Sequence, residues 1–296
     1  MPERYIGRFA PSPTGPLHFG SLLAAVASYL DARASGGLWL VRMEDIDPPR
    51  EVAGAADTIL RQLEAHGLQW DRQVLFQSER QPAYAAIVDD WLSRDMAYCC
   101  ACSRKDVRAM GGIYDGRCRH RHIAREGNAV RVWVPPNTSI RFDDLFQGRQ
   151  WQVLDSEVGD FIIRRRDGLF AYQLAAAADD LHQGITHVIR GSDLLDSTPR
   201  QIFLLRLLGA NAPVYGHIPV AVNPGGQKLS KQTLALSIDH RDPARNLLQA
   251  LAWLGVPVEP ALAGAGPGDI LEGARQLWSP RCVPVSLSRP APSGWA

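Results

Sequence analysis

The N-terminal third of the chain alternates between short apolar runs and stretches whose apolar side chains recur at helical spacing. Tyr5–Phe9 and Leu38–Met43 are apolar runs of strand length, whereas residues 21–34 show the helical period and are followed by two glycines that end a helix. Two more amphipathic helical stretches follow before residue 97. This alternation predicts an α/β fold in which helices cover a parallel sheet.

The alternation is interrupted in the middle of the chain and then resumes. Residues 98–185 contain short extended stretches, which predict an inserted subdomain that is mixed but rich in strands. Beyond it, we expect a strand at His187–Arg190, a helix near Pro199–Leu208, a strand at Val214–Val222 and a last clear helix that ends before Gly255.

These patterns divide the chain into four segments. Residues 1–97 and 186–255 are expected to form two halves of one domain around the insertion at 98–185. The remaining segment, 256–296, is rich in proline, glycine and alanine and is expected to be partly helical, near residues 268–278, or disordered.

Composition and charge limit the class of protein. The 296 residues carry a net charge of +1, which neither predicts nor excludes a nucleic-acid partner. No apolar run approaches the roughly 18 residues of a membrane span, and the N-terminus lacks the pattern of a signal peptide. Four of the five cysteines cluster between Cys99 and Cys118, which fits a reducing compartment better than a secreted disulfide framework. We therefore expect a cytoplasmic protein without membrane contact.

Two separate stretches carry residues suited to handling phosphate. After the first strand, a turn with Gly15 leads into a helix that begins near His18, and helix N-termini of this kind bind anions. Gly20 would let a ligand approach the backbone, and His18 can donate a hydrogen bond to a phosphoryl oxygen. Far along the chain, a glycine-containing loop carries Lys228 and Lys231, two of only three lysines, which could close on a leaving pyrophosphate. Each stretch alone has ordinary explanations, a capping histidine and a solvated turn, but the pair in this order is hard to attribute to chance.

The same residues resemble a known family. Pro13–Gly20 (PTGPLHFG) is similar to the HIGH motif of class I aminoacyl-tRNA synthetases, with Phe19 in place of isoleucine. Lys228–Gln232 (KLSKQ) is similar to the KMSKS motif of the same enzymes, with leucine and glutamine substituted. Arg8–Gly15 (RFAPSPTG) and Arg42–Asp47 (RMEDID) resemble the glutamyl and glutaminyl branch in particular. The resemblance runs from about residue 4 to residue 255.

The resemblance implies a Rossmann-like catalytic domain at 1–97 and 186–255, with the KMSKS-like loop in its second half, and an acceptor-binding-like subdomain at 98–185. It also implies ATP as a substrate, used with Mg²⁺. The implied catalytic residues are His18, Gly20, Lys228 and Lys231. The implied ATP-binding residues are Pro13, Thr14, Gly15, His18, Gly20, Ser21, Lys228, Ser230 and Lys231.

A glutamate pocket is expected at the strand ends, where parallel sheets place their ligands. Glutamate needs an anionic partner for its amino group, a role that suits Glu44, and cationic partners for two carboxylates, a role that suits Arg8 and Arg190. The resemblance implies a glutamate site made of Arg8, Ala10, Ser12, Glu44, Tyr172 and Arg190. Which arginine binds which carboxylate stays open, and the arginines argue against glutamine as the substrate.

The cysteine cluster indicates a structural zinc site. Cys100, Cys102 and Cys118 would supply three thiolates, and the fourth ligand could be Tyr114, His120, His122 or Cys99. Unrelated small buried thiols are the alternative. The spacing of Cys100, Cys102, Tyr114 and Cys118 resembles a zinc site of short glutamyl-synthetase-like proteins, with one ion per chain.

The chain ends at Ala296, too soon after Gln232 for a further domain of typical size, roughly 100–150 residues. We therefore expect no anticodon-binding domain. This arrangement resembles the glutamyl-queuosine tRNA(Asp) synthetase family, which implies that glutamate is activated with ATP and esterified to the cyclopentenediol of queuosine in the anticodon of tRNA(Asp).

The expected partners are therefore tRNA(Asp) carrying queuosine, L-glutamate and ATP, and the expected oligomeric state is a monomer. Three alternatives remain from the sequence. The first is a truncated glutamyl-tRNA(Glu) synthetase that charges the 3′ end. The second is a non-catalytic tRNA-binding paralogue. The third is another nucleotidyltransferase with a similar phosphate site, which suits the KLSKQ loop and the pocket around Glu44 poorly.

Overall fold

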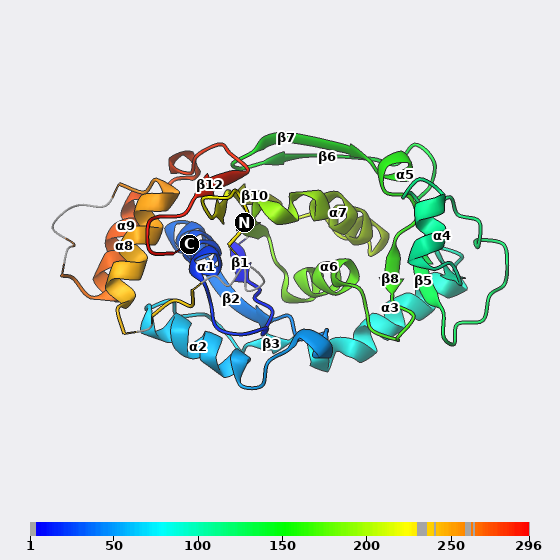
Figure 1. The fold of residues 1–296 in the computed structure, drawn as a ribbon, viewed down its shortest axis with the longest axis horizontal. Coiled ribbons are helices and arrows are strands. Elements are labelled where there is room, and N and C mark those ends of the chain that lie inside the picture. Colours follow the sequence, from blue (N-terminus) through cyan, green and yellow to red (C-terminus); the bar gives the residue numbers. More distant parts are fainter. Residues whose placement is uncertain (1–3, 230–235, 240, 258–261, 263, 296) are drawn as a thin grey trace.

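The computed structural model describes residues 4–229, 236–239, 241–257, 262 and 264–295. Its long axis runs from a helical end, formed by α8 (Pro243–Leu254) and α9 (Pro267–Leu277), to a small antiparallel sheet at the opposite end (Figure 1). No helix among the described residues is long and apolar enough to cross a membrane.

Parallel strands form the centre of the molecule. The strands concerned are β1 (Ile6–Phe9), β2 (Leu38–Met43), β3 (Leu75–Phe76), β9 (His187–Gly191) and β10 (Val214–Ile218). β1 pairs with β2, β2 with β3, and β9 with β10, all in the parallel sense. The backbone N–H of Thr186 donates to the carbonyl of Ile6 over 2.9 Å, so β9 lies beside β1. The predicted α/β class with a parallel sheet is confirmed.

Helices cover both faces of these strands. Along β2, Trp39 and Val41 belong to one buried apolar cluster and Leu40 to another, as the two-residue period of a strand requires. The first cluster includes side chains of α1 (Phe19–Ala34), α2 (Ala55–Ala65), α8 and α9. The second includes side chains of α3 (Gln81–Ser93), α6 (Tyr172–Gln183) and α7 (Thr198–Leu207). A strand buried on both faces reads as a continuous apolar run, which is why β2 could be predicted with its exact bounds.

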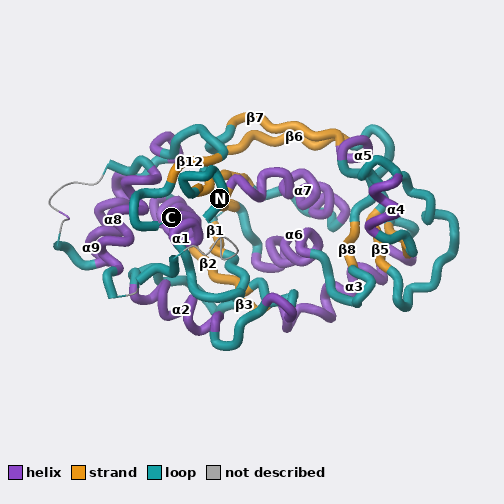
Figure 2. The backbone as a smooth tube through the Cα atoms, viewed as in Figure 1, coloured by secondary structure: helices purple, strands orange, loops and turns teal. Residues whose placement is uncertain are grey.

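The region after α3 is antiparallel. Its three-stranded sheet consists of β4 (Ala97–Cys100), β5 (Ala129–Val132) and β8 (Ile162–Arg164), and β6 (Ser139–Asp144) forms a hairpin with β7 (Gly148–Val153). The short helices α4 (Arg104–Ala109) and α5 (Leu154–Glu157) flank these strands (Figure 2). Short 3₁₀ segments lie at Pro48–Arg50 (η1), Gln77–Arg80 (η2), Ser192–Ser197 (η3) and Pro280–Cys282 (η6).

The sequence pattern did not predict α6, which lies inside the stretch that we expected to be rich in strands. Residues 174–180 of this helix are all buried, so it presents no polar face whose period could be recognised. The helix matters for the site, because it begins at Tyr172 and carries Asp180.

The single strand expected at Val214–Val222 is wrong in detail. The structure has two strands there, β10 and β11 (Val220–Val222), separated by Pro219, whose nitrogen cannot donate a ladder hydrogen bond. β11 pairs in parallel with β12 (Ser288–Pro290), a strand in the segment for which helix or disorder was expected. The helix expected near residues 268–278 is confirmed as α9.

Candidate active site

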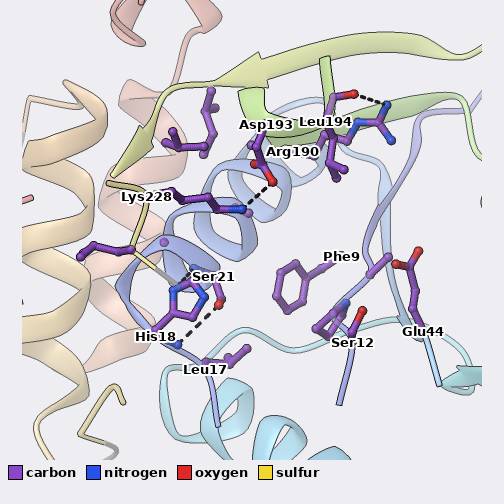
Figure 3. A pocket seen from close by; sticks show the side chains of 18 of the residues that line it. Phe9, Ser12, Leu17, His18, Ser21, Glu44, Arg190, Asp193, Leu194 and Lys228 are labelled. Atoms are coloured by element: carbon purple, nitrogen blue, oxygen red, sulfur yellow. Dashed lines mark hydrogen bonds and ion pairs between the residues drawn. The ribbon is translucent and has the colours of Figure 1, made fainter. Parts of the chain in front are cut away.

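A cavity of about 410 Å³ opens at the carboxyl ends of the parallel strands (Figure 3), within the range of roughly 300–1,000 Å³ of small-molecule pockets. It brings together all six residues that the sequence predicted for glutamate: Arg8, Ala10, Ser12, Glu44, Tyr172 and Arg190. It is also lined by five of those predicted for ATP: Thr14, His18, Gly20, Ser21 and Lys228. Pro13 and Gly15 are not among its lining residues, and Ser230 and Lys231 lie outside the described residues.

His18 caps the N-terminus of α1. Its Nδ1 accepts the backbone N–H of Ser21 over 3.3 Å, and the Ser21 hydroxyl accepts the backbone N–H of His18 over 3.4 Å. Because Nδ1 is an acceptor, the neutral ring carries its proton on Nε2. A Cβ at position 20 would lie 3.1 Å from His18 Cε1, so Gly20 also makes room for this ring. The arrangement presents a ring donor beside a helix N-terminus.

Lys228 is held at the edge of the cavity by an acidic residue that the sequence did not single out. Its ammonium group forms an ion pair with Asp193 in η3, directly after β9 (Figure 3). The neighbouring Leu229 is buried, and its N–H donates to the carbonyl of Ala221 in β11 over 2.8 Å. A carboxylate immediately after a parallel strand was the signal that could have identified Asp193.

The chain that follows the Lys228 loop is hydrogen-bonded to the residues before α1. The backbone N–H of Ile238 donates to the carbonyl of Leu17 over 2.9 Å. Gln62, buried in α2, accepts the N–H of Leu17 over 2.8 Å and donates to the carbonyl of Ile238 over 3.2 Å. Both described flanks of the loop are thereby anchored, one on β11 and one next to His18. A polar residue inside an amphipathic helix gives no sequence signal for such a role, so Gln62 was missed.

A cluster of buried charges lies behind Arg8 and Glu44, which line the cavity. Asp180 in α6 accepts from Arg42 over 2.8 Å and from Arg8 over 3.3 Å, and Arg42 approaches Glu44 at 3.7 Å. Burial alone raises the pKa of Asp180, but Arg8 and Arg42 outweigh it and hold the pKa below its usual range. This carboxylate is therefore ionised and fixes both arginines.

Glu44 is the acidic group that faces the ligand space. Its side chain is 9 % exposed, and its buried Oε1 lies 3.7 Å from Arg42 Nη2, an ion pair too long for a hydrogen bond. Burial raises the pKa of Glu44, and Arg42 and Arg8 offset only part of this effect. Because Glu44 also lines the cavity, its carboxylate can accept from a ligand, and an ammonium group would suit it in charge.

Arg190 supplies the opposite charge from β9. Its side chain is buried, and its partners are the uncharged groups of His217, Gln201, Thr198 and the carbonyl of Leu194. Within the described part of the chain, no carboxylate forms an ion pair with it. The guanidinium therefore keeps a positive charge that a ligand anion could balance.

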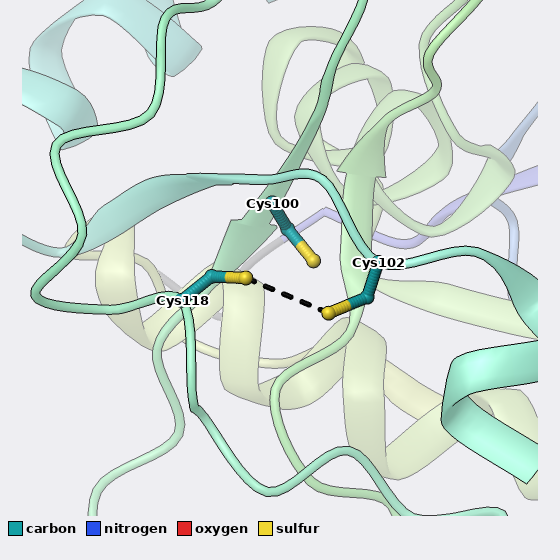
Figure 4. A group of neighbouring side chains, drawn as sticks. All are labelled: Cys100, Cys102 and Cys118. Atoms are coloured by element: carbon teal, nitrogen blue, oxygen red, sulfur yellow. Dashed lines mark hydrogen bonds between the residues drawn. The ribbon is translucent and has the colours of Figure 1, made fainter. Parts of the chain in front are cut away.

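The predicted metal ligands converge at the other end of the molecule. The Sγ atoms of Cys100, Cys102 and Cys118 all lie within 4.8 Å of one another (Figure 4). The Tyr114 hydroxyl is 3.3 Å from Cys100 Sγ and 3.9 Å from Cys102 Sγ. The other three candidates for a fourth ligand, Cys99, His120 and His122, do not belong to this cluster, and both histidines are exposed.

The fold and the cavity together define an α/β nucleotide-binding protein whose anion site adjoins a buried acidic and basic pocket. A family model described as "tRNA synthetases class I (E and Q), catalytic domain" matches residues 6–262. The chain belongs to this family of class I tRNA synthetases.

Relatives and solved structures agree with this assignment. The protein named Glutamyl-Q tRNA(Asp) synthetase from Pseudomonas entomophila (strain L48) is 53% identical over 288 residues, which cover 97% of each chain. The protein of the same name from Ectopseudomonas mendocina (strain ymp) is 51% identical over 288 residues, again 97% of each chain. The crystal structure of a glutamate tRNA ligase from Elizabethkingia meningosepticum superposes with a TM-score of 0.81 at 24% identity, covering 98% of this chain and 67% of that one, which shows the shared fold.

The raised pKa of Glu44 predicts how pH affects ligand binding. With L-glutamate as the probe, affinity should fall as pH falls through this raised pKa, because protonation removes the anionic partner of the ammonium group. Since the pKa is raised, the loss should begin at a higher pH than an exposed glutamate would cause. Isothermal titration calorimetry at a series of pH values measures it.

Glu44→Gln is the matched control for this measurement. It should bind L-glutamate at least about tenfold more weakly and should show a flatter pH profile, since the titrating carboxyl is gone. Wild-type affinity in this variant, or an unchanged pH profile, would contradict the assigned role of Glu44.

Proposed function

We propose that this protein activates L-glutamate with ATP and transfers the glutamyl group to the queuosine base in the anticodon of tRNA(Asp). The activation step rests on one observation: a single cavity joins the His18 anion site to a pocket lined by Glu44 and Arg190. The choice of acceptor rests on the relatives named Glutamyl-Q tRNA(Asp) synthetase, which match nearly the whole chain at 53% identity.

Glutamate is held by charge complementarity. Its ammonium group binds Glu44, and its two carboxylates bind Arg8 and Arg190, since guanidinium groups match carboxylates in geometry and charge. Ala10, Ser12 and Tyr172 line the same pocket and complete its shape. Glutamine would present a neutral amide in place of one carboxylate, so one arginine would lose its charged contact with the substrate, which costs binding energy in a buried site.

Adenylation follows from the neighbouring anion site. An α-carboxylate oxygen of glutamate attacks the α-phosphorus of ATP, and the bond to pyrophosphate breaks. The Nε2–H of His18 and the ammonium groups of Lys228 and Lys231 stabilise the charge that develops on the phosphoryl oxygens. The remaining groups of the ATP site are Pro13, Thr14, Gly15, Gly20, Ser21 and Ser230. ATP is used as its Mg²⁺ complex, which neutralises part of the phosphate charge.

Transfer to the acceptor needs no further catalytic group. A hydroxyl oxygen of the queuosine cyclopentenediol attacks the carbonyl carbon of glutamyl-adenylate, AMP leaves, and its phosphate takes up the hydroxyl proton. A cyclopentenediol and the 3′-terminal ribose of a tRNA both present a cis-diol. The same catalytic core can therefore serve either acceptor, and the way in which the tRNA docks determines which one reacts.

The cysteine cluster is proposed to hold one structural Zn²⁺. Three thiols whose sulfur atoms lie within 4.8 Å of one another suit a tetrahedral zinc ion, and the Tyr114 hydroxyl beside them is the proposed fourth ligand. Arg131 supports this cluster, since its Nε donates to Cys100 Sγ over 3.2 Å and its guanidinium lies 3.9 Å from the centre of the Tyr114 ring. The proposed role is to hold together the region between β4 and β5.

Several expectations remain predictions. They are the division into a Rossmann-like catalytic domain at 1–97 and 186–255 with an acceptor-binding-like insertion at 98–185, the monomeric state and the cytoplasmic location.

The function is tested by acylation with labelled glutamate. Queuosine-containing tRNA(Asp), tRNA(Asp) without queuosine and tRNA(Glu) are compared as acceptors in the presence of ATP. The proposal predicts labelling of the first alone. Labelling of tRNA(Glu) alone would instead support a synthetase that charges the 3′ end. Absence of glutamate-dependent ATP–pyrophosphate exchange would favour a non-catalytic tRNA-binding protein.

The role of His18 is tested in the same exchange assay. His18→Ala should lower kcat by about 10²- to 10³-fold, the usual loss for one transition-state donor.

The zinc proposal predicts one Zn²⁺ per purified chain. Cys118→Ser should lower the zinc content and the melting temperature, because a thiolate ligand is lost. Cys282→Ser, a cysteine outside the cluster, is the matched control and should leave zinc unchanged. Elemental analysis that finds no zinc in the wild-type protein would reject the site. The fourth ligand is tested separately, because Tyr114→Phe should weaken zinc binding while leaving the three thiols in place.

A further inference from the structure

Arg190 is oriented by a histidine that lies directly opposite it. β9 and β10 pair Arg190 with His217, and the Nε–H of Arg190 donates to His217 Nε2 over 3.0 Å. Gln201 Oε1 accepts from Nη1 over 2.8 Å, and Thr198 Oγ1 and the carbonyl of Leu194 accept from Nη2 over 2.8 and 3.2 Å. All of these acceptors are uncharged when the histidine is neutral, so the guanidinium is fixed in place without being neutralised.

His217 is itself oriented by a carboxylate. Its Nδ1 lies 2.5 Å from Asp144 Oδ2, and both side chains are fully buried. The other oxygen, Oδ1, accepts the backbone N–H groups of Phe146, Gln147 and His217 over 2.9 to 3.0 Å. Asp144 ends β6, so this residue connects the hairpin of β6 and β7 to the histidine that contacts Arg190.

These contacts determine where the histidine proton lies. Burial raises the pKa of Asp144, but the hydrogen bonds from His217 and the backbone outweigh it and hold the pKa below its usual range. Burial lowers the pKa of His217, and Asp144 offsets this only in part, so the ring is neutral. A carboxylate at Nδ1 keeps the proton on that nitrogen, and Nε2 is left as an acceptor for Arg190. The Thr198 hydroxyl oxygen, which accepts from Nη2 of Arg190, also lies 3.1 Å from Nε2.

We propose that Asp144 and His217 are positioning residues for the amino-acid substrate. Asp144 sets the tautomer of His217, and His217 aims the Arg190 guanidinium into the pocket while leaving its charge for a substrate carboxylate. A carboxylate in the place of His217 would orient Arg190 equally well but would neutralise it. The inference rests on the proposed function, in which Arg190 binds glutamate.

Two substitutions at His217 separate positioning from simple support of the core. His217→Gln places an amide near the position of Nε2 and keeps an acceptor for Arg190, whereas His217→Asn places one near Nδ1 and keeps a donor for Asp144. Glutamate-dependent ATP–pyrophosphate exchange should show a KM for glutamate raised about tenfold or more in His217→Asn, and clearly less in His217→Gln. The KM for ATP should change less than about twofold in both. A larger effect of His217→Gln than of His217→Asn would overturn the proposal, because it would show that contact with Asp144 alone matters.

Asp144→Asn tests the tautomer directly. The amide oxygen can still accept the three backbone N–H groups, but its NH₂ then faces Nδ1 and drives the ring proton onto Nε2, against the Nε–H of Arg190. The KM for glutamate should rise about tenfold with little change in melting temperature, and adding this change to His217→Asn should have little further effect. Asp143→Asn, an exposed neighbour on the same hairpin, should behave as wild type.

The outcomes distinguish a failure of the proposed function from a failure of the positioning role. If the wild-type protein shows no glutamate-dependent exchange, the proposed function fails and this inference fails with it. If the wild-type protein is active but Asp144→Asn leaves the KM for glutamate unchanged, only the positioning role is wrong. If His217→Asn does not fold, Asp144→Asn decides the question alone.

Discussion

The site depends on one buried carboxylate that is shared by two arginines. Asp180 binds Arg8 from β1 and Arg42 from β2, so a single group on α6 fixes cationic side chains on two adjacent strands. Two buried guanidinium groups without such a partner would be strongly unfavourable. Because Asp180 is held ionised by these arginines, a fixed cluster of charges lies behind the pocket, and Arg8, Glu44 and Arg190 are the members of this region that line it.

Asp179, the residue before Asp180, connects α6 to η2 and α3. Asp179 accepts from Gln77 over 2.9 Å and from Arg80 over 3.1 Å, and it also accepts from the hydroxyl of Tyr84. Consecutive carboxylates on one buried helix thus join the parallel strands to η2 and α3. The position of Tyr172, the first residue of α6, follows from the same anchoring, which explains how a residue from the antiparallel part of the sequence lines the cavity.

Much of the fold could be predicted from the sequence, because the strands and helices around the sheet have clear periods. β2 and the helices α1, α2, α3 and α8 were found where the pattern indicated them. The elements that the sequence did not predict were those without a clear period, such as α6, whose residues 174–180 are all buried, and β12, a short strand that pairs with the late strand β11. In the sequence, Pro219 does not stand out as the end of a strand, because the residues on both sides of it are apolar and the whole run matches a single strand.

The site residues also divide into those that the sequence predicts and those that it does not. Residues in recognisable motifs or at strand ends, such as His18, Glu44 and Arg190, could be predicted and meet in one cavity. The residues that hold them could not, because the roles of Asp180, Gln62, Asp144 and His217 arise from contacts between segments that are far apart in the sequence. A single sequence does not show which buried polar groups pair with one another, and that pairing decides how the arginines are aimed.

The central claim is that these buried charges form a glutamate site next to an ATP site. A crystal structure of the protein with L-glutamate and a non-reactive ATP analogue tests it most directly. We expect the ammonium group of glutamate to contact Glu44 and its two carboxylates to contact Arg8 and Arg190. We expect the α-phosphate to lie beside His18. Glutamate bound elsewhere, or bound without contact to Glu44 and Arg190, would contradict it.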